Sequence, residues 1–236
     1  IPFIASAALV IVGLWVRLSI EETPDFQKTL DEGTRVTLPM ATVIAQHPRT
    51  LIAGTFAAVA TFVLFYLMTV FTLSWGTSRL GYSREPFLVM QMIGVLFFAA
   101  AIPISALLAD RFGRRRVLVL VSAAIALFGL VFAPMFSSGS AVGTVAFLSL
   151  GLALMGFTYG PLGAALAELF PTAVRYTGAS LTFNLAGILG ASLAPYAATW
   201  LASGHGLPAV GHYLTASAIV TLLALLAIGK PAHASG

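Results

Sequence analysis

The 236-residue chain contains no cysteine and very few charged residues. The absence of cysteine excludes disulfide bonds and thiol chemistry, and it leaves the redox compartment open. Charged residues make up 8% of the chain, about a third of the share typical of a soluble domain, whereas hydrophobic residues make up 59%. Together with a mean hydropathy of +0.98, this composition excludes an ordinary soluble globular protein and indicates a membrane protein.

Sequence patterns of catalysis and nucleotide binding are also missing. The chain has no Gly-Lys-Ser/Thr phosphate loop, no nucleophile elbow and no cluster of zinc ligands, and its four histidines are scattered. We therefore predict no enzymatic activity, no metal and no cofactor. The net charge of +4 does not indicate a nucleic-acid partner, because the basic residues lie between apolar segments.

Seven long stretches without charge divide the chain. Each holds roughly the 17–25 apolar residues that cross a bilayer as a helix, and none shows the alternation of a barrel strand. The stretches are Ile1–Val16, Leu51–Ser78, Pro86–Ala109, Val117–Phe136, Ala141–Ala167, Tyr176–Ser203 and Leu207–Gly229. We predict an all-α membrane protein with seven transmembrane helices, of which the first is truncated and the last six form a C-terminal bundle.

Basic residues lie mainly on one side of these predicted spans. Ten of the twelve lysines and arginines follow the first, third, fifth or seventh span, and only Arg79 and Arg84 lie on the other side. An excess of lysine and arginine marks the loops on the cytoplasmic side. We therefore predict that the chain starts outside, that its C-terminus is cytoplasmic and that the protein resides in the cell inner (plasma) membrane.

Residues 18–50 form the one long connection between spans. This segment is rich in charge as far as Arg35 and then apolar over Val36–Ile44. Two interpretations stand side by side: a cytoplasmic linker with a short amphipathic helix at the membrane interface, or a solvated charged loop. We divide the chain into the last helix of an N-terminal bundle at 1–17, a central linker at 18–50 and a six-helix bundle at 51–236.

Three short charged motifs lie beside the spans. Leu-Ala-Asp-Arg-Phe-Gly-Arg-Arg-Arg ends at Arg116, Glu-Leu-Phe-Pro-Thr-Ala-Val-Arg-Tyr-Thr-Gly begins at Glu168, and Ile-Glu-Glu-Thr-Pro-Asp-Phe begins at Ile20. The motifs and their spacing resemble the major facilitator superfamily, although Ala106 stands where the family pattern usually has glycine. The particular residues of the motifs resemble those of the metabolite:proton symporter family, which includes carriers for shikimate, 2-oxoglutarate, citrate and proline/betaine. The resemblance implies that five helices of an N-terminal bundle precede this chain.

Charged residues in these motifs are candidates for a cytoplasmic gate, because carboxylate–arginine pairs can link helix ends on that side. The resemblance implies this role for Asp110, Arg114, Glu168 and Arg175, and the shared side of the membrane adds Arg111 and Glu21. The alternative is that the arginines, Arg115 and Arg116 above all, are only topology anchors and contacts for lipid headgroups. Each ion pair would then contribute about 0–1 kcal/mol.

Neutral polar residues inside the spans are candidates for substrate binding. They are Tyr66, Gln91, Tyr159 and Asn184, which lie on spans whose family counterparts line the central cavity. Such groups can bind a polar solute or a neighbouring backbone. The glycines are attributed to helix packing, as in the GxxxG spacing of Gly156 and Gly160, while Pro161 can allow the fifth span to bend.

The combined interpretation is a secondary active transporter. We expect proton-coupled symport of a small organic acid or zwitterion by alternating access, with the solute, protons, the lipid bilayer and an N-terminal helical bundle as partners. No ionisable residue lies at the centre of a span, so the coupling carboxylate is expected upstream of Ile1. Two alternatives remain open: a uniporter or antiporter of sugars or drugs, and a non-transporting membrane sensor or scaffold.

Overall fold

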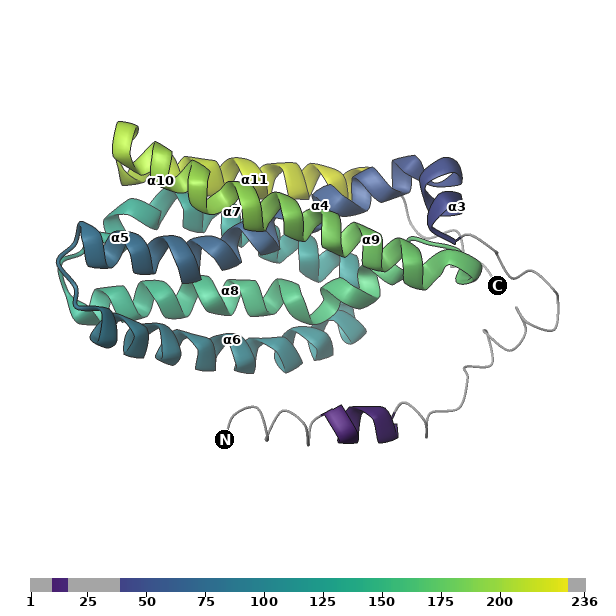
Figure 1. Cartoon of the computed structure of the whole chain (residues 1–236), viewed down its shortest axis with the longest axis horizontal. Coiled ribbons are helices and arrows are strands. Elements are labelled where there is room, and N and C mark those ends of the chain that lie inside the picture. Colours follow the sequence, from purple (N-terminus) through teal and green to yellow (C-terminus); the bar gives the residue numbers. More distant parts are fainter. Residues whose placement is uncertain (1–9, 17–38, 229–236) are drawn as a thin grey trace.

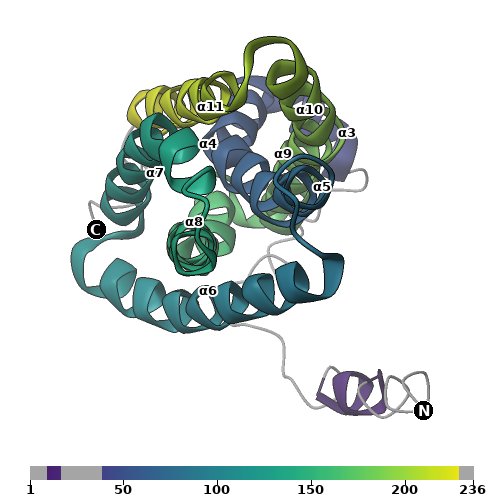
Figure 2. The ribbon, with the colours of Figure 1, turned by 90° about the vertical axis from the view of Figure 1, so that its left-hand side faces the viewer.

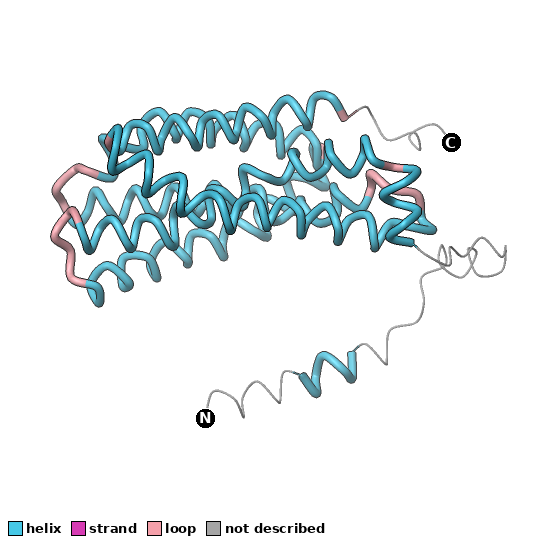
Figure 3. Tube along the Cα trace, turned by 45° about the horizontal axis from the view of Figure 1, so that its top comes forward, coloured by secondary structure: helices cyan, strands magenta, loops and turns pink. Residues whose placement is uncertain are grey.

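The computed structural model describes residues 10–16 and 39–228, and the described chain is helical throughout, without strands. Six helical stretches are long and apolar enough to cross a membrane (Figure 1). Figure 3 shows the described connections gathered at the two ends of the helical bundle. The first predicted span lies mostly outside the described residues. Only its residues 10–16 are described, and they are helical. The described part therefore contains six of the seven predicted spans.

The helices follow one another with short connections. The first part of the bundle consists of α3 (Pro39–Gln46), α4 (Pro48–Tyr66), the π-helical segment η1 (Leu67–Phe71), α5 (Thr72–Ser78), α6 (Arg84–Phe112) and α7 (Arg114–Phe136). The second part consists of α8 (Ala141–Ala167), the 3₁₀ turn η2 (Thr172–Val174), α9 (Arg175–Ile188), the π-helical segment η3 (Leu189–Leu193), α10 (Ala194–His205) and α11 (Leu207–Ala227). The observed spans match the predicted apolar stretches to within about one helical turn.

The turns between spans are set by glycine and proline. Gly113 alone separates α6 from α7, and its φ of 93° is a conformation that side chains disfavour. Gly206, with a φ of 80°, separates α10 from α11 in the same way, and Pro208 follows it in the first turn of α11, where no backbone donor is lost. Charged residues next to Gly113 are therefore held at one end of the bundle.

Two units of three spans interlock. The first unit consists of α4–α5, α6 and α7, and the second of α8, α9–α10 and α11. In each unit the first span packs against the second and third spans of the other unit, and α7 packs against α11 (Figure 2). The spans of α4–α5 and α8 are accordingly the most enclosed, with 56% and 50% of their apolar windows buried, whereas α6 has only 22%. Packing of the first span of each unit against the other unit is typical of a bundle built from two related repeats.

Phenylalanines fill the half of the bundle that lies away from Gly113. Phe132 and Phe136 of α7 pack against Phe147 of α8 with ring centroids 5.0 Å away in both cases, and all three side chains are fully buried. Phe71 and Phe87 extend the cluster to η1 and α6. Offset and edge-on ring contacts of this kind add about 0.5–1.5 kcal/mol per pair beyond burial. This half is therefore a rigid platform for the helices.

Small and hydroxyl side chains allow the helices to approach closely. A Cβ on Gly156 would lie 2.5 Å from the backbone oxygen of Phe98, and one on Gly160 would lie 2.6 Å from that of Ile102. The predicted packing role of the GxxxG spacing is thus confirmed, with α6 as the partner helix. Between α11 and α4, the Thr221 hydroxyl donates to the Phe56 carbonyl at 2.8 Å and accepts from the Ala60 amide at 3.1 Å.

A short helix precedes the bundle. Helix α3 packs on α4, α9 and η2, and its Val43 is fully buried among Leu51, Phe170 and Val174. Its apolar side therefore lies on the end of the bundle, whereas Met40 and Ile44 are exposed. Most of the predicted linker, residues 18–38, lies outside the described residues, so both interpretations of residues 18–50 stay predictions.

Candidate functional site

A charge cluster lies at the end of the bundle that contains Gly113, which we call the basic end. Asp110 is in the last turn of α6, Arg114 opens α7 after the one-residue turn, and Glu168 follows the last residue of α8. Arg114 Nη1 donates to Glu168 Oε1, and Arg114 Nη2 lies 3.8 Å from Asp110 Oδ1. These are the only two ion pairs within the described residues. One guanidinium thus connects the ends of three spans.

The cluster lies at the rim of the bundle rather than deep inside it. The side chains of Arg114, Asp110 and Glu168 are 35%, 70% and 45% exposed. Exposed pairs of this kind contribute only about 0–1 kcal/mol each to stability. The cluster is therefore weak enough to open and close with small changes in helix position, which suits a switch better than a structural clamp.

Arg115 points to the other side of the same helical turn. Its Nε donates to the Leu225 carbonyl at 2.8 Å, and its Nη2 donates to the Leu226 carbonyl at 2.9 Å. These carbonyls belong to the last turn of α11, where no further helical donors are available and a positive charge is favoured. Arg115 is therefore the C-terminal cap of α11 and more than a topology anchor.

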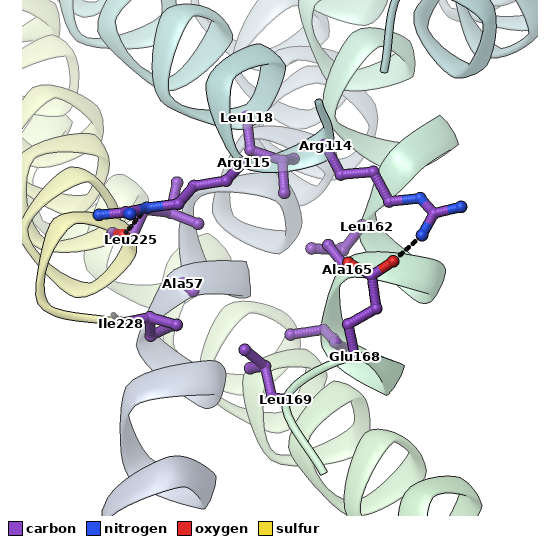
Figure 4. A pocket seen from close by; sticks show the side chains of 11 residues that line it. Ala57, Arg114, Arg115, Leu118, Leu162, Ala165, Glu168, Leu169, Leu225 and Ile228 are labelled. Atoms are coloured by element: carbon purple, nitrogen blue, oxygen red, sulfur yellow. Dashed lines mark hydrogen bonds and ion pairs between the residues drawn. The ribbon is translucent and has the colours of Figure 1, made fainter. Parts of the chain in front are cut away.

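Figure 4 shows Arg114 and Arg115 on two sides of a small cavity at the basic end. Apart from these arginines and Glu168, its walls are apolar and come from α4, α7, α8 and α11; examples are Ala57, Leu118 and Leu162. Its three charged side chains already have protein partners: Arg114 and Glu168 pair with each other, and Arg115 donates to α11. The cavity is a packing gap behind the charge cluster, and we do not place the substrate there.

The other predicted gating residues do not join the cluster. Arg175 donates from Nε to the Phe170 carbonyl at 3.4 Å and so closes its own loop. The Arg111 guanidinium lies over the Phe112 ring, 5.3 Å from its centroid. Glu21 lies outside the described residues. The structure therefore brings together three of the six predicted gating residues: Asp110, Arg114 and Glu168.

A second candidate region lies near the middle of the spans. Phe62 of α4 contacts Phe183 of α9 with centroids 4.9 Å apart, Phe183 lies 6.3 Å from Tyr159 of α8, and Tyr159 lies 5.9 Å from Phe98 of α6. These four rings cross four spans in one row, which we call the aromatic face. Tyr66 follows Phe62 by one helical turn and so belongs to the same side of α4.

Several polar atoms on this face have no hydrogen-bond partner among the described residues. Asn184 is exposed and donates from Nδ2 to the Ser180 carbonyl at 2.7 Å, while its side-chain oxygen has no hydrogen-bond partner among the described residues. Within that part of the chain, the hydroxyls of Tyr66 and Tyr159 are also unpaired, and Tyr159 is 40% exposed. All three residues lie within about 8 Å of the centre of their spans, given a rise of 1.5 Å per residue. Unpaired polar groups at this depth are costly unless they face water, a solute or another polar surface.

Gln91 has a different environment from these three. Its side chain is 8% exposed, and its Nε2 donates to the Met68 and Thr69 carbonyls at 2.9 and 2.8 Å. Both carbonyls belong to η1, where the π-helical geometry disturbs the regular hydrogen bonds of the helix. Gln91 therefore ties α6 to the irregular part of the α4–α5 span. We leave it out of the substrate site, and sequence alone gave no sign of the π-helical segment that it serves.

Comparison with known proteins identifies the family of this chain. Residues 1–195 match the family described as the Major Facilitator Superfamily. The inner membrane metabolite transport protein YhjE of Escherichia coli (strain K12) is 48% identical over 240 residues, covering 100% of this chain and 54% of that protein. A putative metabolite transport protein of Haemophilus influenzae is 40% identical over 238 residues, covering 96% and 54%.

More distant relatives have narrower names. The shikimate transporter of Escherichia coli (strain K12) is 33% identical over 121 residues, which cover 50% of this chain and 28% of that protein. The chain spans about half the length of the curated relatives that match it throughout, 54% in each case. None of these relatives is named as an enzyme, in agreement with the sequence-based prediction. The match over most of the chain, on a bundle of six membrane-spanning helices, shows that the chain belongs to the Major Facilitator Superfamily.

Proposed function

We propose that this bundle is half of a proton-coupled symporter for a small organic acid or zwitterion. The observation that carries the proposal is the aromatic face. Exposed Tyr159 and Asn184 and half-buried Tyr66 have polar groups there without partners among the described residues, near the middle of apolar spans. A solute bound there would hydrogen-bond to these groups and stack on the neighbouring rings. The names of the relatives, which include metabolite and shikimate transporters, support a small polar solute.

The charge cluster supplies a gate in this proposal. Glu168 ends α8, and Tyr159 lies nine residues earlier on the same helix, about 14 Å away along its axis. Pro161 stands between them and has no backbone N–H to donate, so α8 can bend there at lower cost. Closing or breaking the Arg114–Glu168 pair would thereby move the part of α8 that follows Tyr159. The basic end would face the cytoplasm, as its arginines favour.

Proton coupling requires an ionisable group near the solute. Within the described residues, no Asp, Glu, Lys or Arg lies within about 8 Å of the centre of a span, and the one histidine that does, His212 of α11, is not a carboxylate. The coupling carboxylate would therefore belong to a second helical bundle facing the aromatic face. Such a bundle would fit the curated relatives, which are nearly twice as long as this chain.

Uptake into liposomes tests the transport mechanism. The intact protein is reconstituted with an acidic exterior and offered labelled shikimate, 2-oxoglutarate, citrate and betaine, with and without a protonophore. Symport predicts accumulation of one solute above equilibrium, which the protonophore abolishes. Equilibration that ignores the protonophore would instead identify a uniporter. If none of the four solutes is taken up and residues 18–50 capture a cytosolic protein, the results would favour a sensor or scaffold.

Substitutions on the aromatic face test the binding site. Asn184→Ala and Tyr159→Phe each remove a hydrogen-bonding group without filling the face, and we expect each to raise the KM for uptake about 5- to 10-fold, the effect of losing one hydrogen bond of about 1–1.5 kcal/mol. Thr199→Val is the matched control and should leave the KM unchanged, because the exposed Thr199 side chain donates only to Pro195 of its own helix, α10, among the described residues. An unchanged KM in both test variants would remove the aromatic face from the proposed site.

A further inference from the structure

An apolar groove runs between α6 and α7 from the basic end into the membrane-spanning region. Leu108 and Phe112 of α6 form one wall, Leu120 and Val121 of α7 form the other, Phe157 of α8 lies at its base, and Arg116 stands at its mouth. From Arg116 the groove reaches Ala124, eight residues along α7 or about 12 Å. That depth matches most of one leaflet, which is about 15 Å of hydrocarbon.

The groove opens away from the proposed solute site. Phe157 and Tyr159 are two residues apart on α8, so their side chains point about 200° apart around that helix. Tyr159 belongs to the aromatic face, whereas Phe157 lies at the base of the groove. Figure 2 shows α6 on the outside of α8. The walls are partly open, because Leu120 is 70% exposed and Phe112 is 51% exposed. This side of the bundle is therefore in a position to contact lipid.

The mouth of the groove carries positive charge that no carboxylate of the described residues neutralises. Asp110 and Glu168 both lie beside Arg114, and Arg115 caps α11. Neither Arg111 nor Arg116 has a carboxylate partner within the described residues. The Arg111 guanidinium packs over the ring of Phe112, which is itself a wall of the groove. Two arginines that have no ion-pair partner in the described part of the chain thus flank the end of the apolar groove.

We propose that this groove binds an anionic phospholipid of the leaflet at the basic end. The phosphate would lie between Arg116 and Arg111, and one acyl chain would lie along the groove between α6 and α7. Charge complementarity selects an anionic headgroup, and the apolar walls select a lipid over a free phosphate. Because the same turn carries Arg114, the bound lipid would hold the α6–α7 turn beside the charge cluster.

Lipid retention by the purified intact protein tests this proposal. The protein is delipidated in detergent and titrated with phosphatidylglycerol or phosphatidylcholine, and bound lipid is counted by native mass spectrometry. We expect one tightly held phosphatidylglycerol and no equivalent phosphatidylcholine. An arginine near an anionic lipid surface typically contributes about 5-fold in affinity, so Arg111→Met with Arg116→Met should weaken phosphatidylglycerol binding about 30-fold.

Three controls make the test decisive. Arg84→Met, at the opposite end of α6, should leave phosphatidylglycerol binding unchanged. Val121→Trp, which fills the groove and keeps both arginines, should weaken binding as the double variant does, while both proteins keep the wild-type thermal midpoint in phosphatidylcholine. Glycerol phosphate should not compete with the lipid. Equal binding by the double variant, an equal loss in Arg84→Met, or competition by glycerol phosphate would each overturn the proposal.

Discussion

Replacing Glu168 by glutamine in the intact protein is expected to slow solute uptake by up to about 5-fold, the effect of losing an exposed ion pair of up to about 1 kcal/mol. The glutamine keeps the shape of the side chain but removes the charge that accepts from Arg114 Nη1. The end of α8 then loses its connection to the α6–α7 turn, and the closed form of the basic end is no longer favoured. Arg114→Met should have an effect of similar size, because it removes the partner. Initial uptake rates in liposomes, corrected for the amount of reconstituted protein, measure both.

Exchanging the two charges tests whether the Arg114–Glu168 ion pair, and not either residue alone, gates transport. Arg114→Glu combined with Glu168→Arg should restore uptake above the rate of either single variant, since the two side chains can still meet in reversed order. Asp110→Asn is added to all three proteins, because Asp110 would otherwise repel the carboxylate that Arg114→Glu introduces. Glu85→Gln is the matched control: it removes a carboxylate from the first turn of α6, at the other end of the bundle, and should leave uptake unchanged. Normal uptake in Glu168→Gln, or a double variant slower than either single variant, would show that the pair does not gate transport.

The membrane spans were the most predictable part of this fold. Their apolar runs end at charged or turn-forming residues, and the bilayer requires that backbone polar groups bond within each helix. The predicted run Ala141–Ala167 is thus α8 itself. The GxxxG spacing also predicted close packing, because two small residues one turn apart allow a neighbouring backbone to approach. These features depend on sequence that is local to one helix.

The candidate sites were less predictable because their partners are distant in sequence. Asp110, Arg114 and Glu168 could be placed on one side of the membrane from their loops, and they do meet at the basic end. Nothing in the local sequence distinguishes Arg115 from Arg111. The acceptors of Arg115 lie 110 and 111 residues away, whereas Arg111 has no acceptor among the residues that the structure describes. Gln91 was chosen as a polar residue inside a span, but its role depends on η1 in another helix. A π-helical segment reflects packing between helices, which sequence periodicity does not record.

We expect the largest loss of stability from substitutions at the crossing of α7 and α11. Gly129 and Gly211 face each other so closely that a Cβ on Gly211 would lie 2.2 Å from the Gly129 carbonyl oxygen, and one on Gly129 would lie 2.6 Å from the Gly211 oxygen. Backbone atoms on both sides cannot move away as a flexible side chain would. We expect Gly211→Ala to lower the unfolding free energy by about 1–3 kcal/mol, and thereby the thermal midpoint by about 2–12 °C. Gly211→Leu should leave little folded protein.

Gly163→Ala distinguishes the crossing from a general intolerance of substitution. A Cβ at Gly163 meets no atom within 4 Å, and the residue lies inside α8, where alanine is the better helix former by about 0.8–1 kcal/mol. This variant should keep or raise the midpoint, opposite in sign to Gly211→Ala, in thermal unfolding followed by size-exclusion chromatography in detergent. A midpoint that falls equally in both variants would mean that helix propensity and backbone approach do not decide stability here. A loss confined to Gly211→Ala would locate it at the contact of α11 with α7, which closes the two three-span units on each other.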